Sequence, residues 1–226
     1  MKVELIKYTK DPQRTCALAS RMCYSDIGLE ALELEMSEEK CEKLLKYVIA
    51  SGHHSILEHA NFTFSISHVS RALLAQMTRH RLASFSVQSQ RYVKASVPEF
   101  VVPPSIASDE KILKKYNSFI LNAYQVYAEL LEAGIIKEDA RFVLPNAVAT
   151  NIIVSMNARE LRHFFAIRCC RRSQWEIRDL AWHMLKLAKE IAPILFEDAG
   201  PGCIRGHCPE VKPCGNPYKK EFLQTL

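Results

Sequence analysis

The sequence has few glycines, and this scarcity excludes two familiar ways of binding nucleotides. Only seven glycines occur among 226 residues, and none forms a G-x-G-x-x-G motif or a G-x-x-x-x-G-K-[ST] loop. Runs of about 18 apolar residues, the length that crosses a membrane, are also absent. The first segment, MKVELIKYTK, carries charges among its apolar residues. We therefore expect no membrane contact, and a β-strand rather than a signal peptide at the start.

The eight cysteines do not form the pattern of a disulfide scaffold. Cys169 and Cys170 are adjacent, a geometry that rarely allows a bridge. Cys203, Cys208 and Cys214 are separated by four and five residues, which is not the usual ligand spacing of structural zinc. We predict a reduced, cytoplasmic chain without a bound metal.

Alternating and helical periods are mixed along the chain, which predicts an α+β (mixed α/β) fold with a small central sheet flanked by helices. Alternation in VELIKY and NFTFSIS predicts strands, and long amphipathic segments predict helices. A single domain over residues 1–226 is expected, with an irregular tail that contains cysteines from about residue 200 to 226. The residues expected to cap helices are Asp11, Ser37, Asn157 and, with Glu176 in a capping box, Ser173.

The segment RHRLASFSVQSQRYVK, residues 79–94, concentrates cationic and hydrogen-bonding side chains without any carboxylate. Guanidinium groups match the geometry of phosphate oxygens, and serine and glutamine side chains complete such a site. The segment therefore predicts a bound anion, although a solvated basic strand is the alternative. Ser89 has no G-x-S-x-G context, so a hydrogen bond to a ligand is expected of it rather than nucleophilic attack.

Two further segments contain candidate ligand-binding residues. SGHHSILEH reads as H-x-x-x-E-H on a helix, one residue away from the zinc-protease spacings, so metal binding is not expected. His53 and Glu58 either bind a ligand or form a capped polar turn. In NARELRHFFAIR, Asn157 caps a helix whose N-terminus favours anions, and Arg159 and His163 share one face. A solvated helix face is the alternative there.

The net charge of +5 is compatible with an anionic small molecule or with nucleic acid. A nucleic-acid-binding module would need stacking aromatics among the basic residues, and only Phe85 and Tyr92 are available. A metal-dependent hydrolase would have to use the HHSILEH cluster and the tail. These residues alone leave the three readings open, and the expectation of an enzyme acting on small anionic substrates, without nucleic acid as a partner, comes from the family resemblance of the same segments.

Together these segments resemble the flavin-dependent thymidylate synthases. The family signature R-H-R-x-x-S-x-N-x-x-S-x-R-Y is matched by Arg79, His80, Arg81, Ser84, Ser89, Arg91 and Tyr92. GHHSILEH is similar to the G-H-x-[ST]-x-x-E-H segment of the family, and the ARFVLP, NARELRHFFAIR and QWEIR segments are similar to its third block. The sequence departs from the pattern at Ser86, usually asparagine, at Val87, often acidic, and at His163, an asparagine in some members.

The resemblance implies a FAD-dependent methyltransferase of thymidylate biosynthesis. Deoxyuridylate (dUMP) would receive a one-carbon unit from 5,10-methylenetetrahydrofolate and a hydride from FAD reduced by NADPH. Family members are homotetramers, so self-association is implied. By position, the residues implied to bind FAD are His53, Ser55, Glu58, Arg79, His80, Arg81, Asn157, Arg159 and His163. Those implied to bind dUMP are Gln76, Gln88, Ser89, Gln90, Arg91, Arg141 and Arg168, with Arg168 and Ser89 at the reacting ring.

Overall fold

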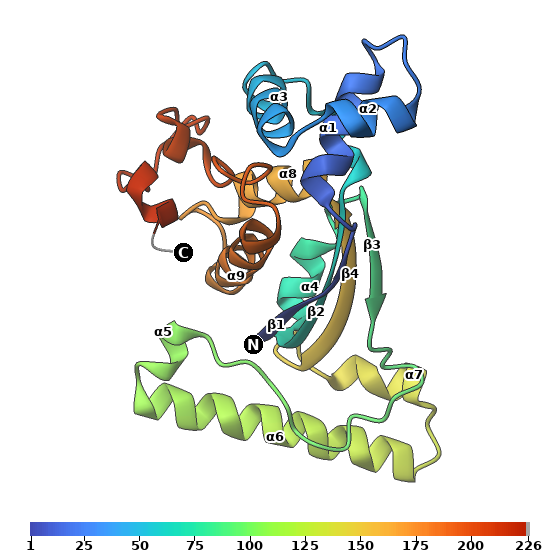
Figure 1. Ribbon diagram of the computed structural model, residues 1–226. Helices are drawn as coiled ribbons and strands as arrows, with labels where there is room; N and C mark the ends of the chain where they lie inside the picture. Colours follow the sequence, from blue (N-terminus) through green and yellow to red (C-terminus); the bar gives the residue numbers. More distant parts are fainter. Residues whose placement is uncertain (225–226) are drawn as a thin grey trace. The chain divides into compact units, whose positions relative to one another are not determined.

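The computed structural model describes residues 1–224 and divides the chain into two compact units (Figure 1). The first unit comprises residues 1–2, 66–79 and 85–153, and the second comprises residues 3–65, 80–84 and those from Val154 onward. Each unit thus combines segments that are far apart in the sequence. The single domain over residues 1–226 stays a prediction.

A four-stranded antiparallel sheet in the order β1-β2-β4-β3 confirms the α+β class. Its strands are β1 (Lys2–Tyr8), β2 (Asn61–Ser70), β3 (Ala83–Val87) and β4 (Ala149–Asn157). The predicted alternation in NFTFSIS is confirmed, because Phe62, Phe64 and Ile66 on β2 are fully buried. Each of the four strands contributes residues to both units.

The helices of the first unit are dominated by the long α6 (Glu110–Glu132) (Figure 1). Asp109 accepts the backbone N–H groups of Lys111 and Ile112 at its start, and Gly134 follows its end with a φ of 84°. Ile120 and Tyr124 of α6 pack against Val148 to form the core of this unit. The other helices are α4 (Arg71–Met77), α5 (Pro104–Ala107) and α7 (Lys137–Ala140), followed by the 3-10 turn η2 (Arg141–Val143).

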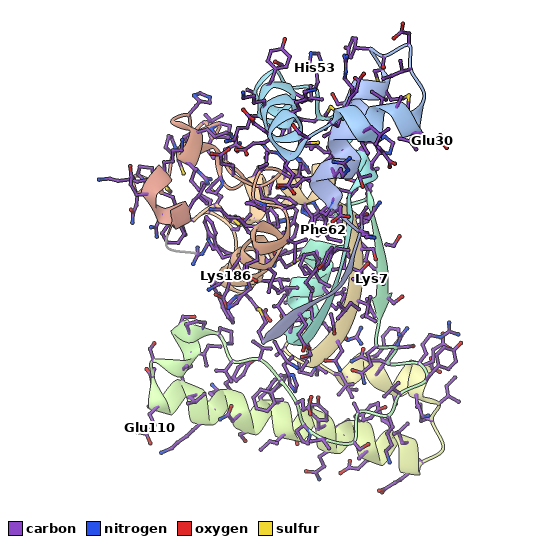
Figure 2. The ribbon with its side chains drawn as sticks, in the orientation of Figure 1. Lys7, Glu30, His53, Phe62, Glu110 and Lys186 are labelled. Carbon is purple, nitrogen blue, oxygen red and sulfur yellow. The ribbon has the colours of Figure 1, made fainter. Side chains whose placement is uncertain are left out.

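The second unit buries a cluster of aromatic side chains. Phe62, labelled in Figure 2, packs edge-to-face on Phe196 with ring centroids 5.4 Å apart, and Phe165 packs on the same ring at 5.9 Å. The helices of this unit are α1 (Pro12–Met22), α2 (Leu29–Glu35), α3 (Glu38–Ala50), α8 (Ala158–Arg168) and α9 (Trp175–Ile191), with 3-10 turns η1 (His54–His59), η3 (Gly202–Arg205) and η4 (Lys220–Gln224). None of the helices in the described part of the chain combines the length and the apolar character needed to cross a bilayer.

The expected helix caps are partly confirmed. Ser37 and Asn157 accept backbone N–H groups from Lys40 and Glu160. Asp11 forms no side-chain cap, because it takes a left-handed conformation with a φ of 46°. The capping box at Ser173 is wrong: Gln174 is the cap of α9, and its side-chain oxygen accepts the N–H groups of Glu176 and Ile177.

Candidate functional site

The predicted ligand-binding residues fall into two groups, one in each unit. The first unit holds Arg79 and, of the residues expected at dUMP, Gln76, Gln88, Ser89, Gln90, Arg91 and Arg141. The second unit holds Arg168 and, of the residues expected at FAD, His53, Ser55, Glu58, His80, Arg81, Asn157, Arg159 and His163.

In the first unit, the structure brings Gln88, Ser89 and Gln90 into the wall of one cavity of about 190 Å³. These residues follow the end of β3, and the N–H of Gln88 donates to the carbonyl of Asn151 on β4. Lys94 and Arg71 add two cations to the same wall. The Oγ of Ser89 accepts the N–H of Arg91 at 3.2 Å, a local turn contact and not activation by a base.

Arg71 is a candidate that the sequence reasoning missed, because it stands outside the R-H-R segment. It is the first residue of α4, directly after β2, and Ser70 caps the helix by accepting the N–H of Leu73. One guanidinium nitrogen, Nη2, donates to the carbonyl of Gln88 at 2.7 Å. The Nε of Arg71 is buried and has no hydrogen-bond partner among the described residues. Burial, and then the positive charge of Arg141, lower the pKa of Arg71, which favours an anion beside it.

Three other candidates of this unit, Arg91, Arg141 and Gln76, have partners within the protein. Nη2 of Arg91 lies 2.9 Å from Oε2 of Glu138, so the basic segment 79–94 has a carboxylate partner that lies outside it in the sequence. Nε of Arg141 donates to the carbonyl of Glu138 at 3.0 Å. Gln76 lies on α4 and donates to the carbonyl of Ala72 at 3.4 Å. Glu138 therefore holds two of the predicted cations in place.

In the second unit, a larger cavity of about 800 Å³ has Arg159 and His163 in its wall. Asn157, the last residue of β4, is the N-cap of α8, and the predicted placement of Arg159 and His163 on one face of this helix is confirmed. His54, Arg162 and Arg205 add further basic groups to the wall. Glu160 and Asp198 also line it, so the wall is basic on balance, and its volume is within the range of small-molecule sites.

The GHHSILEH segment approaches this site through an ion pair. It forms the 3-10 turn η1, not the expected helix, so His54 and Glu58, four residues apart, are not stacked as in an α-helix. Glu58 instead pairs with Nη1 of Arg159. His53, labelled in Figure 2, follows the end of α3, and both it and Ser55 are exposed. Exposed side chains at this position are accessible to a ligand.

The His80 ring of the R-H-R motif is buried, with only 4% of the residue exposed. Its Nδ1 lies 2.9 Å from Oε1 of Glu160, and its Nε2 accepts a hydrogen bond from Nε of Arg168 at 3.0 Å. Because Nε2 accepts, the proton of the neutral ring must be on Nδ1, where it is donated to Glu160. The structure thus gives this ring the position of a bridge between Glu160 and Arg168.

The electrostatics of this chain favour the neutral ring. Burial lowers the pKa of His80 below 6.5; Glu160 acts in the opposite direction, and Arg168 lowers the pKa further. Glu160 is a second residue missed from the sequence, where it looks like an ordinary charge in the first turn of a helix. A neutral His80 at physiological pH keeps its acceptor nitrogen available for Arg168.

All eight cysteines are free thiols, and two of those in the core, Cys16 and Cys169, are poor nucleophiles. Burial raises the pKa of Cys16 to about 12 and that of Cys169 well above its usual range. Cys170, Cys203 and Cys208 line a separate cavity of about 610 Å³ together with Cys214. The described residues include no group of three or more potential ligands with metal-binding geometry.

The chain is similar to characterised proteins over almost its whole length. Residues 4–194 match the family model described as thymidylate synthase complementing protein. The chain is 50% identical over 212 residues to the flavin-dependent thymidylate synthase of Geobacter sulfurreducens, covering 93% of this chain and 91% of that protein. It is 43% identical over 242 residues to the enzyme of the same name from Clostridium tetani, covering 99% and 97%.

The fold also has a counterpart among solved structures. The crystal structure of the UMP/dUMP methylase PolB from Streptomyces cacaoi, bound with 5-Br dUMP, superposes with a TM-score of 0.77. The two chains share 24% identity, and the match covers 87% of this chain and 93% of the other.

Proposed function

Since the chain belongs to the family of flavin-dependent thymidylate synthases, we propose that it converts dUMP to thymidylate. The one-carbon unit comes from 5,10-methylenetetrahydrofolate, and the two electrons come from NADPH. The products are thymidylate, tetrahydrofolate and NADP⁺. The observation that carries this proposal is the basic cavity of about 800 Å³ whose wall contains Arg159 and His163 of the family motif.

This cavity suits FAD in size and in charge. Its volume is in the upper part of the range for small-molecule sites, and its basic side chains match an anionic dinucleotide. We assign Arg159 and His163 to FAD, with Glu58 orienting Arg159 through their ion pair. His53, Ser55, Arg79, Arg81 and Asn157 complete the proposed set. His80 contributes to the site by positioning Arg168.

The smaller cavity of the first unit suits the phosphate of a mononucleotide. Its volume of about 190 Å³ is too small for a dinucleotide, and its wall combines Arg71 and Lys94 with the polar side chains of Gln88, Ser89 and Gln90. We assign these residues to dUMP, with Gln76, Arg91 and Arg141. Arg71 is an addition that the family motif did not imply.

Reduced FAD, when bound in the larger cavity, would supply the hydride that completes the methyl group. The residues of the chain have the task of orienting the pyrimidine and stabilising its charge. We assign to Arg168 the polarisation of a uracil carbonyl, since a guanidinium stabilises the negative charge that develops when C5 loses its proton. Ser89 holds the nucleotide by a hydrogen bond. The buried Cys16 and Cys169 are protonated, which is consistent with chemistry that needs no thiolate at the ring.

We also propose that the enzyme is a homotetramer of the cytoplasm. Large apolar side chains are exposed beside predicted site residues: Phe142 next to Arg141 is 82% exposed, and Tyr92 next to Arg91 is 73% exposed. Such side chains favour a subunit interface. Eight free thiols fit a reducing compartment. Light scattering coupled to gel filtration measures the number of subunits, and a monomer would contradict the proposed homotetramer.

The function is tested by the visible spectrum of the purified protein, followed by tritium release from C5-labelled dUMP. We expect a flavin spectrum that bleaches with NADPH, and tritium release that depends on methylenetetrahydrofolate. A protein that neither contains nor takes up FAD would refute the proposal, and oligonucleotide binding across a salt series would then be measured.

A further inference from the structure

The C-terminal segment, expected to be irregular, has a tightly built conformation. Gly200 has a φ of 139°, and a Cβ on it would lie 2.8 Å from the Cδ1 of Ile204. A Cβ on Gly202 would lie 2.6 Å from the carbonyl oxygen of His207. Both positions therefore require glycine. Ile204, whose side chain approaches Gly200, is buried, with only 5% of the residue exposed. The turn η3, which ends at Arg205, is fixed by these contacts.

The rest of the segment lies beside α9 (Figure 1), and aromatic and polar contacts hold it there. The ring of Trp182 packs edge-to-face on Tyr218 at 5.1 Å and on Phe222 at 4.9 Å. Nζ of Lys189 donates to the carbonyl of Leu223 at 2.7 Å. The guanidinium of Arg171 lies 4.1 Å from the centre of the Tyr218 ring. The segment is thus held to the second unit at its far end as well as at η3.

Through this conformation, Arg205 enters the wall of the same cavity as Arg159 and His163. Its Nη1 donates to two neutral acceptors, the carbonyl oxygens of Asp198 at 2.9 Å and of Gly200 at 3.5 Å. These bonds engage one end of the guanidinium and orient it, but they do not neutralise its charge.

The carboxylates around the cavity have other partners, and that of Glu160 in the wall accepts a hydrogen bond from the ring of His80. Glu58 pairs with Arg159, and Asp198 lies 2.7 Å from Nη2 of Arg162. Burial acts to raise the pKa of Asp198, but Arg162 and then Arg205 lower it below its usual value. Two cations therefore share one carboxylate. Among the described residues Arg205 forms no ion pair within salt-bridge distance, so it is the cation of this wall that most needs an external anion.

We propose that Arg205 binds the pyrophosphate of FAD. This inference rests on the proposed function. The pyrophosphate is the anionic part of FAD, so an uncompensated cation in a FAD cavity recognises that part by its charge. Arg205 lies beyond residues 4–194 of the family match, and the family signature does not include it. The C-terminal segment thereby becomes a cofactor-retaining element.

The test compares Arg205→Gln with Arg172→Gln in the full-length protein. Glutamine at position 205 removes the charge but can still donate to the two carbonyl oxygens. Arg172 is the matched control, since it also supports the segment, by donating to the carbonyl of Lys212 and pairing with Glu210, but does not line the cavity. Each purified holoenzyme is dialysed free of flavin and titrated with FAD, and separately with dUMP, at two ionic strengths.

We expect the Kd for FAD to rise about tenfold in Arg205→Gln, with a weaker dependence on salt than in the native protein. Arg172→Gln should change it less than twofold, and neither variant should change the Kd for dUMP. The inference is overturned if Arg205→Gln binds FAD within twofold of native, if both variants lose affinity equally, or if dUMP binding is lost instead. A native protein that binds no FAD would refute the proposed function itself.

Discussion

Replacing Arg168 by alanine should destabilise the protein in a way that depends on pH. The substitution removes the donor at 3.0 Å from Nε2 of His80, whose residue is only 4% exposed. A buried acceptor that loses its donor costs about 1–3 kcal/mol. At pH 8, where His80 is neutral, we expect the free energy of unfolding to fall by about this amount.

The size of this loss should shrink as the pH falls. The folded-state pKa of the native His80 is lowered below 6.5, so the native protein loses stability as the pH falls from the unfolded value through the folded one. Arg168 is one of the groups that lower this pKa, whereas Glu160 raises it. In Arg168→Ala the His80 ring is therefore easier to protonate, and the protonated ring can pair with the carboxylate of Glu160. Lowering the pH therefore reduces the free energy of unfolding of the variant by less than that of the native protein.

Urea unfolding of both proteins at pH 8.0, 6.5 and 5.5, at one protein concentration, measures the difference directly. Arg172→Gln is the control, since its partners Lys212 and Glu210 do not include a histidine. A difference between native and Arg168→Ala that is constant over this range, or that widens toward pH 5.5, would refute the assigned tautomer of His80. The same variant should retain FAD and lose nearly all tritium release, because the group that polarises the pyrimidine is gone.

Three further substitutions test other parts of the site. Ser89→Ala should raise the Kd for dUMP and leave the flavin content unchanged; calorimetric titration and the absorbance ratio of the purified variant measure the two effects. Arg71→Gln should raise the Kd for dUMP by at least about tenfold, since a charge-assisted hydrogen bond contributes about 1.5–3 kcal/mol, and unchanged nucleotide affinity would exclude Arg71 from the site. Asn157→Ala should lower the free energy of unfolding by about 1 kcal/mol, because α8 loses its cap. The Kd for FAD should also rise, because Arg159 is less well placed. Thermal unfolding measures the first effect and FAD titration the second, and a gain in stability would contradict the capping role.

The sequence was sufficient to predict the elements whose signals are local. The alternation of Phe62, Phe64 and Ile66 predicts β2, and the capping residue Asn157 predicts the start of α8. The motif likewise predicts the shared face of Arg159 and His163. These predictions succeed because hydrophobic period and capping chemistry depend on neighbouring residues.

The residues that were missed depend on contacts between distant segments. Glu160 resembles a surface charge, and only the position of His80, eighty residues earlier, makes it a buried partner. Arg205 resembles part of a loop, and only the two glycines and the aromatic contacts of the tail bring it to the cavity. The capping box at Ser173 failed for a local reason, because the side chain of Gln174 satisfies the same N–H groups.

Both cavities take an arginine from a place where a strand becomes a helix without a connecting loop. β2 ends at Ser70 and α4 begins at Arg71, and β4 ends at Asn157 and α8 begins at Ala158. One inserted residue in the first turn of either helix would rotate the side chains beyond it by about 100° around the helix axis. At these two junctions a change of a single residue would therefore turn Arg71 or Arg159 away from the cavity that it lines.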